Sequence, residues 1–596
     1  MKKVLLVSTA LLIGGISFAD NENYDGQTVT ADFSGKSMNY SSWVSANISR
    51  SNFSNAKLKE TVFTNATISA TDFSESNLTD AIFDNITSYK GNFSYAILVR
   101  ASFKDAHLLA YTSEYNTYTN FTGANLKGAD FSNADFVPSV NTYKNEGVRF
   151  TNATLINSNF SNTKLIGQYG SFVVFDNADI TGANFTNAIF AITREDNHYT
   201  QDYAAVLNIS KFSSVNFSNA KFAVFTWGEG ASVDFSNKEF ENVDFSNAIL
   251  SAKYWSDSNA KSVSFANSTF KNCDFTGATL GVNGAANGVD FSNIDVSNTS
   301  FKNANLYGVL FEQSNISGSD FSNANGLTTS QLSQTLNYKN KDLSGVKFNG
   351  LDLTNWILRG QNLQNTSFNG ANLTGVNARY ADLRGSDLTG ITGSLKTQNT
   401  IWTDGEIKNF TMESVDDSLS ILAYVPATSG GAMINAKIAD DASISGGAVL
   451  TLEQGAVLEI ASGKTLSVLD NSEIIFNVDA ASDATKILLG ENSKLAFGSD
   501  SKITINLDGT ISPDDSYTFS VIETAVGSQV TGTDSLKKEN VILYVNSEEY
   551  DSSKWTFDFD SSTGALNINV NVPEPAEWAM IFGAVTLAFA AYRRRK

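Results

Sequence analysis

Large apolar residues recur at every fifth position along the first two thirds of the chain. A helix would bring such residues back after three or four positions and a strand after two, so neither element explains a period of five. A backbone that turns a corner every five residues does, because it points one large residue inward per side. Four corners close a square coil of 20 residues. The clearest run fills eleven consecutive slots: Phe33, Met38, Trp43, Ile48, Phe53, Leu58, Phe63, Ile68, Phe73, Leu78 and Phe83.

A small residue stands two positions before most of these slots, as at Ala46, Ser51 and Ala56. The other three positions of each unit are mostly Asn, Ser, Asp, Thr or Lys. The pattern predicts that the large and the small residue face inward while the other three face outward. Phe and Leu or Ile often alternate, and slots ten apart lie on opposite sides of a four-sided coil. Phe should therefore face Phe across one axis, and Leu should face Ile across the other.

Units such as Ala124–Gly128, Ala129–Asn133 and Ala371–Gly375 read Ala, then Asn or Asp, then Leu or Phe. They resemble the pentapeptide-repeat family, whose consensus is A-(D/N)-(L/F)-x-x. The resemblance runs with interruptions from Asp32 to Gly390. It implies an all-β chain folded as a right-handed quadrilateral β-helix. It implies little about activity, because a fold does not determine a function.

The interruptions follow a rule of their own. Apolar slots come in groups of four, separated by gaps of 14, 13 and 15 residues at 136→150, 222→235 and 250→265. Four slots make one coil, so we expect one excursion per coil from the same corner, stacked into a ridge. Aromatic residues in these excursions form a candidate ligand ridge of Tyr115, Tyr118, Tyr143, Trp227, Tyr254 and Trp255.

Two interpretations of this ridge remain open. Exposed rings beside hydrogen-bonding groups suit the binding of glycans or proteins. Alternatively, the rings fold back and cover the side of the column. His198, near Glu195 and Asp196 in the longest insertion, is a weak candidate for a metal or catalytic group, whereas His107 precedes a slot residue and should face solvent.

The sequence predicts two repeat segments, 20–324 and 343–400, joined by a helical linker at 325–342. Thr328 and Gln331 have the spacing of a capping box, and Leu327, Leu332 and Leu336 could line one helix face.

The period changes after about residue 400. Residues 401–571 contain short alternating segments between Gly, Asn and Asp turns, which predict a smaller β-solenoid or cap. This region weakly resembles the tail of autotransporter-type passenger regions. The clearest predicted strands are Gly447–Leu452, Gly455–Ile460, Gly463–Val468 and Ser472–Val478, with later ones at Lys502–Leu507, Tyr517–Ile522, Val541–Val545 and Trp555–Phe559.

Residues 1–19 have the layout of a secretory signal. Two lysines precede an apolar run from Val4 to Ile16, and small residues then lead to cleavage between Ala19 and Asp20. The run is shorter than the roughly 20 residues of a membrane span, so a cleaved signal is favoured over an anchor. We therefore expect the chain to be exported.

Residues 572–596 combine three elements at the other end. A Pro573-Glu574-Pro575 box precedes an apolar stretch from Ala576 to Tyr592, which predicts one transmembrane helix, and Arg593, Arg594 and Arg595 follow. This tail resembles the PEP-CTERM sorting signal of Gram-negative bacteria. The resemblance implies that an exosortase in the inner membrane removes the tail and passes the protein to the cell surface or extracellular matrix.

Composition narrows the function classes. The chain of 596 residues has 41 Lys and Arg against 62 Asp and Glu, which argues against nucleic acid as a partner. Residues 401–572 hold 26 acids and 9 bases, hence −17 of the total of −21. One Cys, Cys273, fills a small inward slot and should be a buried inert thiol, and two His cannot build a multi-His metal centre.

These observations predict no cofactor, no metal and no catalytic residue. We expect an exported non-catalytic structural or adhesive protein of the bacterial cell surface or exopolysaccharide matrix. Its expected partners are the export machinery, the exosortase and, as an open possibility, matrix polysaccharide. The alternatives are a glycan- or ice-binding protein that uses the aromatic ridge and, more remotely, a polysaccharide lyase-like enzyme.

Overall fold

The chain forms two compact units. The computed structural model describes residues 4–6, 20–109, 118–136, 148–165, 173–190, 207–222, 234–251, 263–283, 288–479, 484–509, 516–532, 538–550, 555–559 and 566–571. The first unit comprises Met1–Asn340 with Lys347–Asn349, and the second comprises Lys341–Val346 with Gly350–Lys596. Each unit has its own core.

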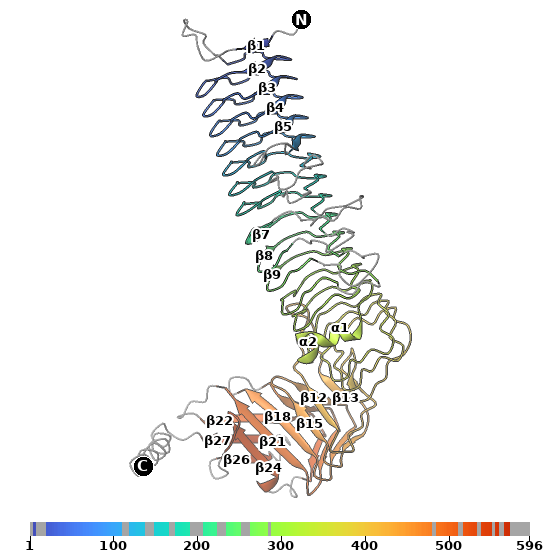
Figure 1. Ribbon diagram of the computed structural model, residues 1–596. Coiled ribbons are helices and arrows are strands. Elements are labelled where there is room, and N and C mark those ends of the chain that lie inside the picture. Colours follow the sequence, from blue (N-terminus) through green and yellow to red (C-terminus); the bar gives the residue numbers. More distant parts are fainter. Residues whose placement is uncertain are drawn as a thin grey trace, which may run out of the picture. The chain divides into compact units, whose positions relative to one another are not determined.

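The first unit is a stack of coils (Figure 1). Where the repeat is uninterrupted, backbone pairs join residues 20 positions apart, as at Asp32, Asn52, Asp72 and Asn92. This spacing confirms the predicted coil of four five-residue sides. One side of the first coils forms the parallel sheet β1 (Val4–Leu6), β2 (Thr28–Thr30), β3 (Asn47–Ser49), β4 (Thr67–Ser69), β5 (Thr87–Tyr89) and β6 (His107–Leu109). A second parallel sheet follows at β7 (Lys211–Ser213), β8 (Glu239–Glu241) and β9 (Thr269–Lys271).

Two facing columns of phenylalanine fill the core, as predicted. Along one column, Phe73 stacks on Phe53 and Phe93 with ring centroids 4.9 and 5.0 Å apart. Across the coil, Phe73 meets Phe83 edge to face at 6.0 Å. Both geometries are favourable for aromatic rings, at about 0.5–1.5 kcal/mol per pair beyond burial. Similar contacts continue through the stack as far as Phe348.

The outward positions follow from the turn at each corner. The second residue after each slot adopts a left-handed backbone, for example Asn55 at φ 58° and Gly123 at φ 69°. Asn and Gly tolerate this conformation best, which explains their frequency there. The small residues before the slots, such as Ala56 and Thr61, are buried as predicted.

Residues 325–342 contain two short helices, α1 (Thr329–Gln334) and α2 (Leu336–Lys339). Thr328 caps α1, and both hydrogen bonds of the capping box with Gln331 are present. Leu332 is buried, but Leu336 is 39% exposed. The expectation that Leu327, Leu332 and Leu336 share one apolar face is therefore wrong for Leu336, because the chain breaks at Thr335 and a new helix starts.

The second unit begins with further five-residue sides. Leu343, Leu363 and Leu383 follow one another at steps of 20 and are buried. A short antiparallel pair, β10 (Thr400–Ile401) and β11 (Ile407–Lys408), ends this segment.

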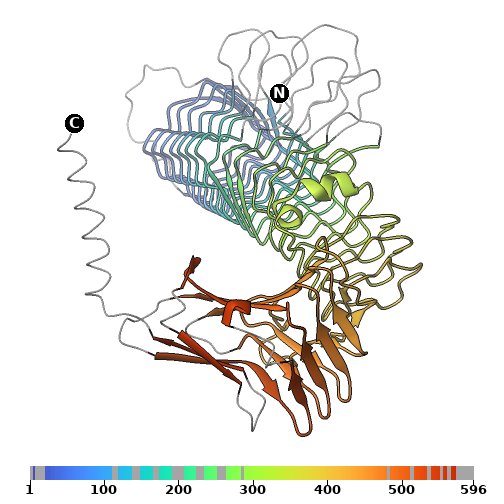
Figure 2. The ribbon, with the colours of Figure 1, turned by 90° about the horizontal axis from the view of Figure 1, so that it is seen from below.

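A three-sided parallel β-solenoid follows, in agreement with the predicted change of period (Figure 2). Each turn contributes one strand to each of three sheets, and the inward rows of Leu, Ile and Val form the core. The first side holds β12 (Ser418–Ile421), β15 (Val449–Leu452), β18 (Glu473–Asp479), β21 (Lys502–Asp508), β24 (Val541–Val545) and β25 (Glu548–Glu549). The second holds β13 (Ala436–Ile438), β16 (Val457–Ile460), β19 (Lys486–Leu489), β22 (Ser516–Thr524), β27 (Leu566–Asn571) and β26 (Trp555–Phe559). The third holds β14 (Ala442–Ile444), β17 (Thr465–Val468), β20 (Lys494–Phe497) and β23 (Gln529–Thr531), and a 3-10 turn at Lys538–Asn540 precedes β24.

The last strands change direction. Antiparallel pairs β22–β27, β26–β27 and β24–β25 replace the parallel ladder. This change explains why the spacing in the sequence is less regular after β21. Among the described residues, no helix has the length and apolar character needed to cross a membrane.

Candidate functional site

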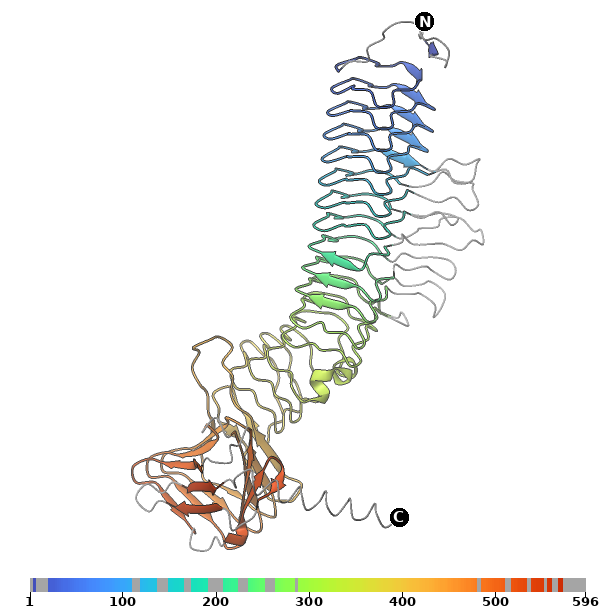
Figure 3. The same cartoon turned by 90° about the vertical axis from the view of Figure 1, so that its left-hand side faces the viewer.

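The excursions leave the column at one place. Seven successive coils bring their departure points into a single stack: His107, Asp135, Lys164, Ile189, Lys221, Ile249 and Thr279. The chain returns at a second stack that contains Asn120, Arg149 and Val174. The residues on both flanks therefore confirm that the chain leaves each of these coils at the same corner, as predicted. Figure 3 shows the stacked coils from the side.

Of the six residues predicted for the ligand ridge, the structure describes only Tyr118. Tyr115, Tyr143, Trp227, Tyr254 and Trp255 lie outside the described residues, as does His198. The Tyr118 ring is half-buried and lies under the guanidinium of Arg149 on the next coil, 4.6 Å from ring centroid to guanidinium carbon. This ring follows the second interpretation, in which the aromatic residue covers the side of the column.

Asn and Asp side chains form vertical ladders on the outer surface. The carboxylate of Asp72 accepts a hydrogen bond from the backbone N–H of Ser74 at 3.0 Å and another from Asn92 Nδ2 on the next coil at 2.8 Å. Asn120 Nδ2 then donates to Asn92 Oδ1 at 3.2 Å. An amide can accept from one coil and donate to another, whereas an ionised carboxylate can only accept, so the ladders favour Asn over Asp.

A charged ladder lies on a different side of the column. Glu241 pairs with Lys211 at 3.0 Å and with Lys271 at 2.7 Å, on adjacent coils. Hydrogen bonds from Lys271 and Lys211 lower the pKa of the Glu241 carboxyl to about 2. All three side chains reach solvent, so the ladder adds little stability and acts as part of a polar surface.

The single cysteine is structural, as predicted. Cys273 is buried, and its thiol lies 3.6 Å from the carbonyl oxygen of Phe240. Burial raises the pKa of the thiol to about 11, which disfavours the reactive thiolate. His107 is exposed, also as predicted.

The second unit contains a buried ion pair that the sequence analysis did not predict. Arg384 and Asp382 form an ion pair whose side chains are 1% and 5% exposed. Arg384 also donates to the carbonyl oxygens of Leu422 at 2.7 Å and Ile434 at 3.1 Å. The five-residue repeat predicts that position 384 faces outward. Residues 422–434 cover it instead, and only the tertiary fold brings them there.

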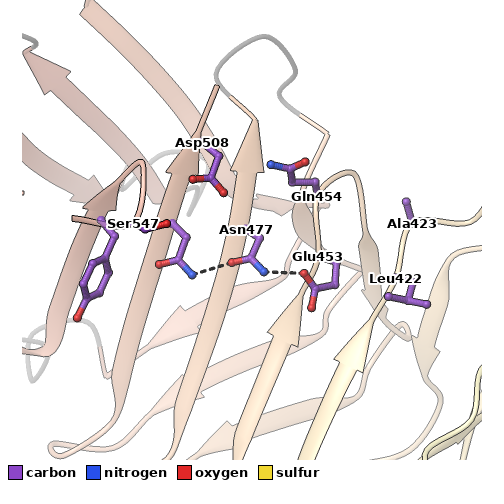
Figure 4. A pocket seen from close by; sticks show the side chains of 9 residues that line it. Leu422, Ala423, Glu453, Gln454, Asn477, Asp508 and Ser547 are labelled. Carbon is purple, nitrogen blue, oxygen red and sulfur yellow. Dashed lines mark hydrogen bonds between the residues drawn. The ribbon is translucent and has the colours of Figure 1, made fainter. Parts of the chain in front are cut away.

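An open polar groove of about 840 Å³ lies on the outer face of the β15–β18–β21 sheet (Figure 4). Asn477 Nδ2 donates to Glu453 Oε2 at 2.6 Å, and Asn506 Nδ2 donates to Asn477 Oδ1 at 2.7 Å. The groove is lined by Leu422, Ala423, Glu453, Gln454, Asn477, Asn506, Asp508, Tyr544 and Ser547. The predicted strands Ser472–Val478, Lys502–Leu507 and Val541–Val545 contain Asn477, Asn506 and Tyr544 at outward positions, but the sequence could not align one strand with the next.

The terminal signals are described only in part. Val4–Leu6 of the predicted secretory signal form β1 and pair with β2. Asp20, after the predicted cleavage point, accepts hydrogen bonds from Ser37 and from the backbone of Asn39, both at 2.8 Å. Ala19 and the sorting residues Pro573, Glu574, Pro575, Arg593, Arg594 and Arg595 lie outside the described residues. Within the described part of the chain, no group of three or more His, Cys, Asp or Glu could hold a metal.

A comparison with protein-family models identifies the five-residue repeat. The model of pentapeptide repeats matches in eight copies, at residues 46–85, 117–137, 239–277, 287–325 and 358–390. No enzyme family was detected. A comparison with curated proteins found no match.

A comparison with solved structures matched two pentapeptide repeat proteins among others. The first is HetL, a pentapeptide repeat protein involved in heterocyst differentiation regulation from the cyanobacterium Nostoc sp. strain PCC 7120. It has 16% identity and a TM-score of 0.11, over 65% of this chain and 92% of HetL. The second is QnrB1, a plasmid-mediated fluoroquinolone resistance protein, with 14% identity and a TM-score of 0.12 over 50% of this chain and 92% of QnrB1.

Proposed function

The chain carries pentapeptide repeats, and we propose that it is an exported, non-catalytic structural or adhesive protein of the bacterial cell surface or exopolysaccharide matrix. In this role the column holds its excursions at fixed spacing along one corner. The matrix or a neighbouring cell would then meet a row of segments that all leave from one corner. Such a row gains avidity from repetition without a strong individual contact.

The observation that supports this proposal most is the stack of seven departure points from His107 to Thr279. Adjacent coils of a β-solenoid are about 4.8 Å apart, so successive departure points are separated by about that distance along the column. The phenylalanine columns inside and the Asn ladders outside tie each coil to the next. Repetition on one corner therefore comes with a rigid support.

Export and sorting belong to the same proposal. The secretory signal at residues 1–19 and the tail with Pro573-Glu574-Pro575, a membrane span and an Arg cluster are sequence predictions. They would route the chain through the inner membrane to an exosortase.

Cell fractionation with surface proteolysis tests the routing. The full chain is expressed in a Gram-negative host that has an exosortase, beside a variant with Pro573, Glu574 and Pro575 all changed to Ala. We expect the parent chain at the surface or in the medium, shortened at the C-terminus, and the variant in the inner membrane. Val572→Ala, next to the box, is the matched control and should behave like the parent.

Cell aggregation and retention of matrix polysaccharide in a deletion strain test the structural role. Loss of either, restored by the parent chain, supports the proposal. A parent chain that stays in the cytoplasm, or a deletion strain with unchanged matrix, contradicts it.

A further inference from the structure

We propose that the polar groove on the β15–β18–β21 sheet binds a neutral polysaccharide chain. This inference deepens the proposed role in a polysaccharide matrix by naming a site and a ligand class. The site is distinct from the aromatic ridge. Binding to the purified protein does not depend on export, so the two proposals can fail separately.

The groove is organised around one row of side chains that crosses four neighbouring strands. In the strand register, Asn477 lies beside Asn506, and Asn506 lies beside Tyr544. Glu453 follows the last residue of β15 and accepts the hydrogen bond from Asn477. With strands about 4.8 Å apart, the row from Glu453 to Tyr544 extends over roughly 14 Å. An extended ligand that crosses the strands would meet all four side chains.

Hydrogen bonds fix these side chains before any ligand arrives. Glu453 is held from both sides, since Ser420 Oγ donates to its Oε1 at 2.7 Å and Asn477 donates to its Oε2. The bond from Asn506 Nδ2 to Asn477 Oδ1 then fixes the orientation of both amide groups. Each amide nitrogen carries two hydrogens and uses one within the row, which leaves the second for another acceptor. A site that is already ordered loses little conformational entropy on binding.

The lining favours uncharged hydroxyl groups as its partners. It contains the carboxylates of Glu453 and Asp508, the amides of Gln454, Asn477 and Asn506, and the hydroxyls of Tyr544 and Ser547. Sugar hydroxyls both donate and accept, so they can donate to the carboxylates and accept from the amides. None of the nine lining residues is Lys or Arg, and the surrounding region is strongly acidic, which disfavours uronates, phosphates and nucleic acids.

Tyr544 adds the aromatic surface that a sugar ring requires. Its ring is apolar while its hydroxyl can hydrogen-bond, so it can contact the C–H face of a sugar and one of its hydroxyls. The volume of about 840 Å³ also falls within the roughly 300–1,000 Å³ that is usual for ligand sites.

Hydrogen bonds from the five-residue repeat hold one wall of the groove in place. Leu422 and Ala423 form one wall, and their carbonyl oxygens accept hydrogen bonds from Arg384 Nη2 at 2.7 Å and Gln364 Nε2 at 3.0 Å. Both donors come from the five-residue repeat, and both also contact Asp382. The wall is therefore attached to a buried polar cluster, so the width of the groove is set by the fold.

Affinity electrophoresis and isothermal titration of the full chain test the proposal. The probes are cellohexaose and maltohexaose as neutral chains, and polygalacturonate as an anionic one. The test variants are Asn506→Ala, in the middle of the row, and Tyr544→Ala, at its end. Ser467→Ala is the matched control, because Ser467 faces outward on β17 of a different sheet.

We expect at least one neutral hexasaccharide to bind the parent chain and Ser467→Ala equally. Loss of a hydrogen bond in the row should weaken binding about tenfold in Asn506→Ala. Circular dichroism and thermal melting must match the parent, and Tyr544→Phe should keep part of the affinity lost in Tyr544→Ala. The proposal is overturned if neither neutral chain binds, if polygalacturonate binds more tightly, or if both test variants bind like the parent.

Discussion

Replacing Arg384 by methionine tests whether the buried ion pair holds the second unit together. Methionine keeps much of the side-chain volume but removes the charge and every donor. The substitution breaks the hydrogen bonds to both carboxylate oxygens of Asp382 and to the carbonyl oxygens of Leu422 and Ile434. Asp382 then stays buried with only Gln364 and the backbone N–H of residue 384 as donors.

The expected cost follows from this geometry. Breaking a buried ion pair by removing one partner typically costs about 3–5 kcal/mol, because the remaining charge is left without compensation. Two carbonyl oxygens that lose their donors add to this cost. Changing Arg384 and Asp382 together to Met and Leu should recover most of it, since a well-packed apolar pair can replace a buried ion pair.

Urea unfolding followed by tryptophan fluorescence measures the effect, with hydrogen exchange to locate it in the second unit. Arg359→Met is the matched control: Arg359 is on the same repeat segment, is exposed, and lies 4.2 Å over the Tyr380 ring. It should cost about 1 kcal/mol or less. The reasoning is refuted if Arg384→Met costs no more than Arg359→Met, or if the double variant is less stable than either single one.

Three further predictions concern the column. Phe73→Ala should cost about 3–5 kcal/mol and expose amides of the adjacent coils to hydrogen exchange, because it removes a ring that stacks on both sides. Cys273, with its pKa raised to about 11, should resist Ellman's reagent at pH 8 in the folded chain and react fully in denaturant. The Glu241 carboxyl should titrate by NMR near pH 2; its stabilising effect is present above its ordinary pKa of 4.5 and disappears as the pH falls through about 2.

Each of these has a simple control. Ser74→Ala, on the outer surface beside Phe73, should change stability little, so an equal loss would contradict the role of the ring stack. Rapid labelling of folded Cys273 would contradict its burial. Changing Lys211 and Lys271 to Met should return the Glu241 titration toward 4.5, and an unchanged midpoint would exclude the lysines as the cause.

Much of the column could be predicted because its order is local and repeated. A fixed step of five residues determines which side chains face inward, so the facing Phe columns and the buried Cys273 followed from spacing alone. The same counting located the common corner of the excursions. Asn at the turn positions reflects a left-handed backbone, which is also a local property. Leu336 does not share the apolar helix face predicted with Leu332, because α1 ends before Thr335 and α2 begins at Leu336.

The sequence by itself determined the coil, its inward residues and the change of period near residue 400. Only the tertiary structure decided what covers Arg384 and which outward residues align across β15, β18, β21 and β24. The physical reason is the difference between a period and a register. A period can be counted along consecutive residues. The register of paired strands whose residues lie 24 to 38 positions apart depends instead on turns of unequal length and on the packing of side chains between strands.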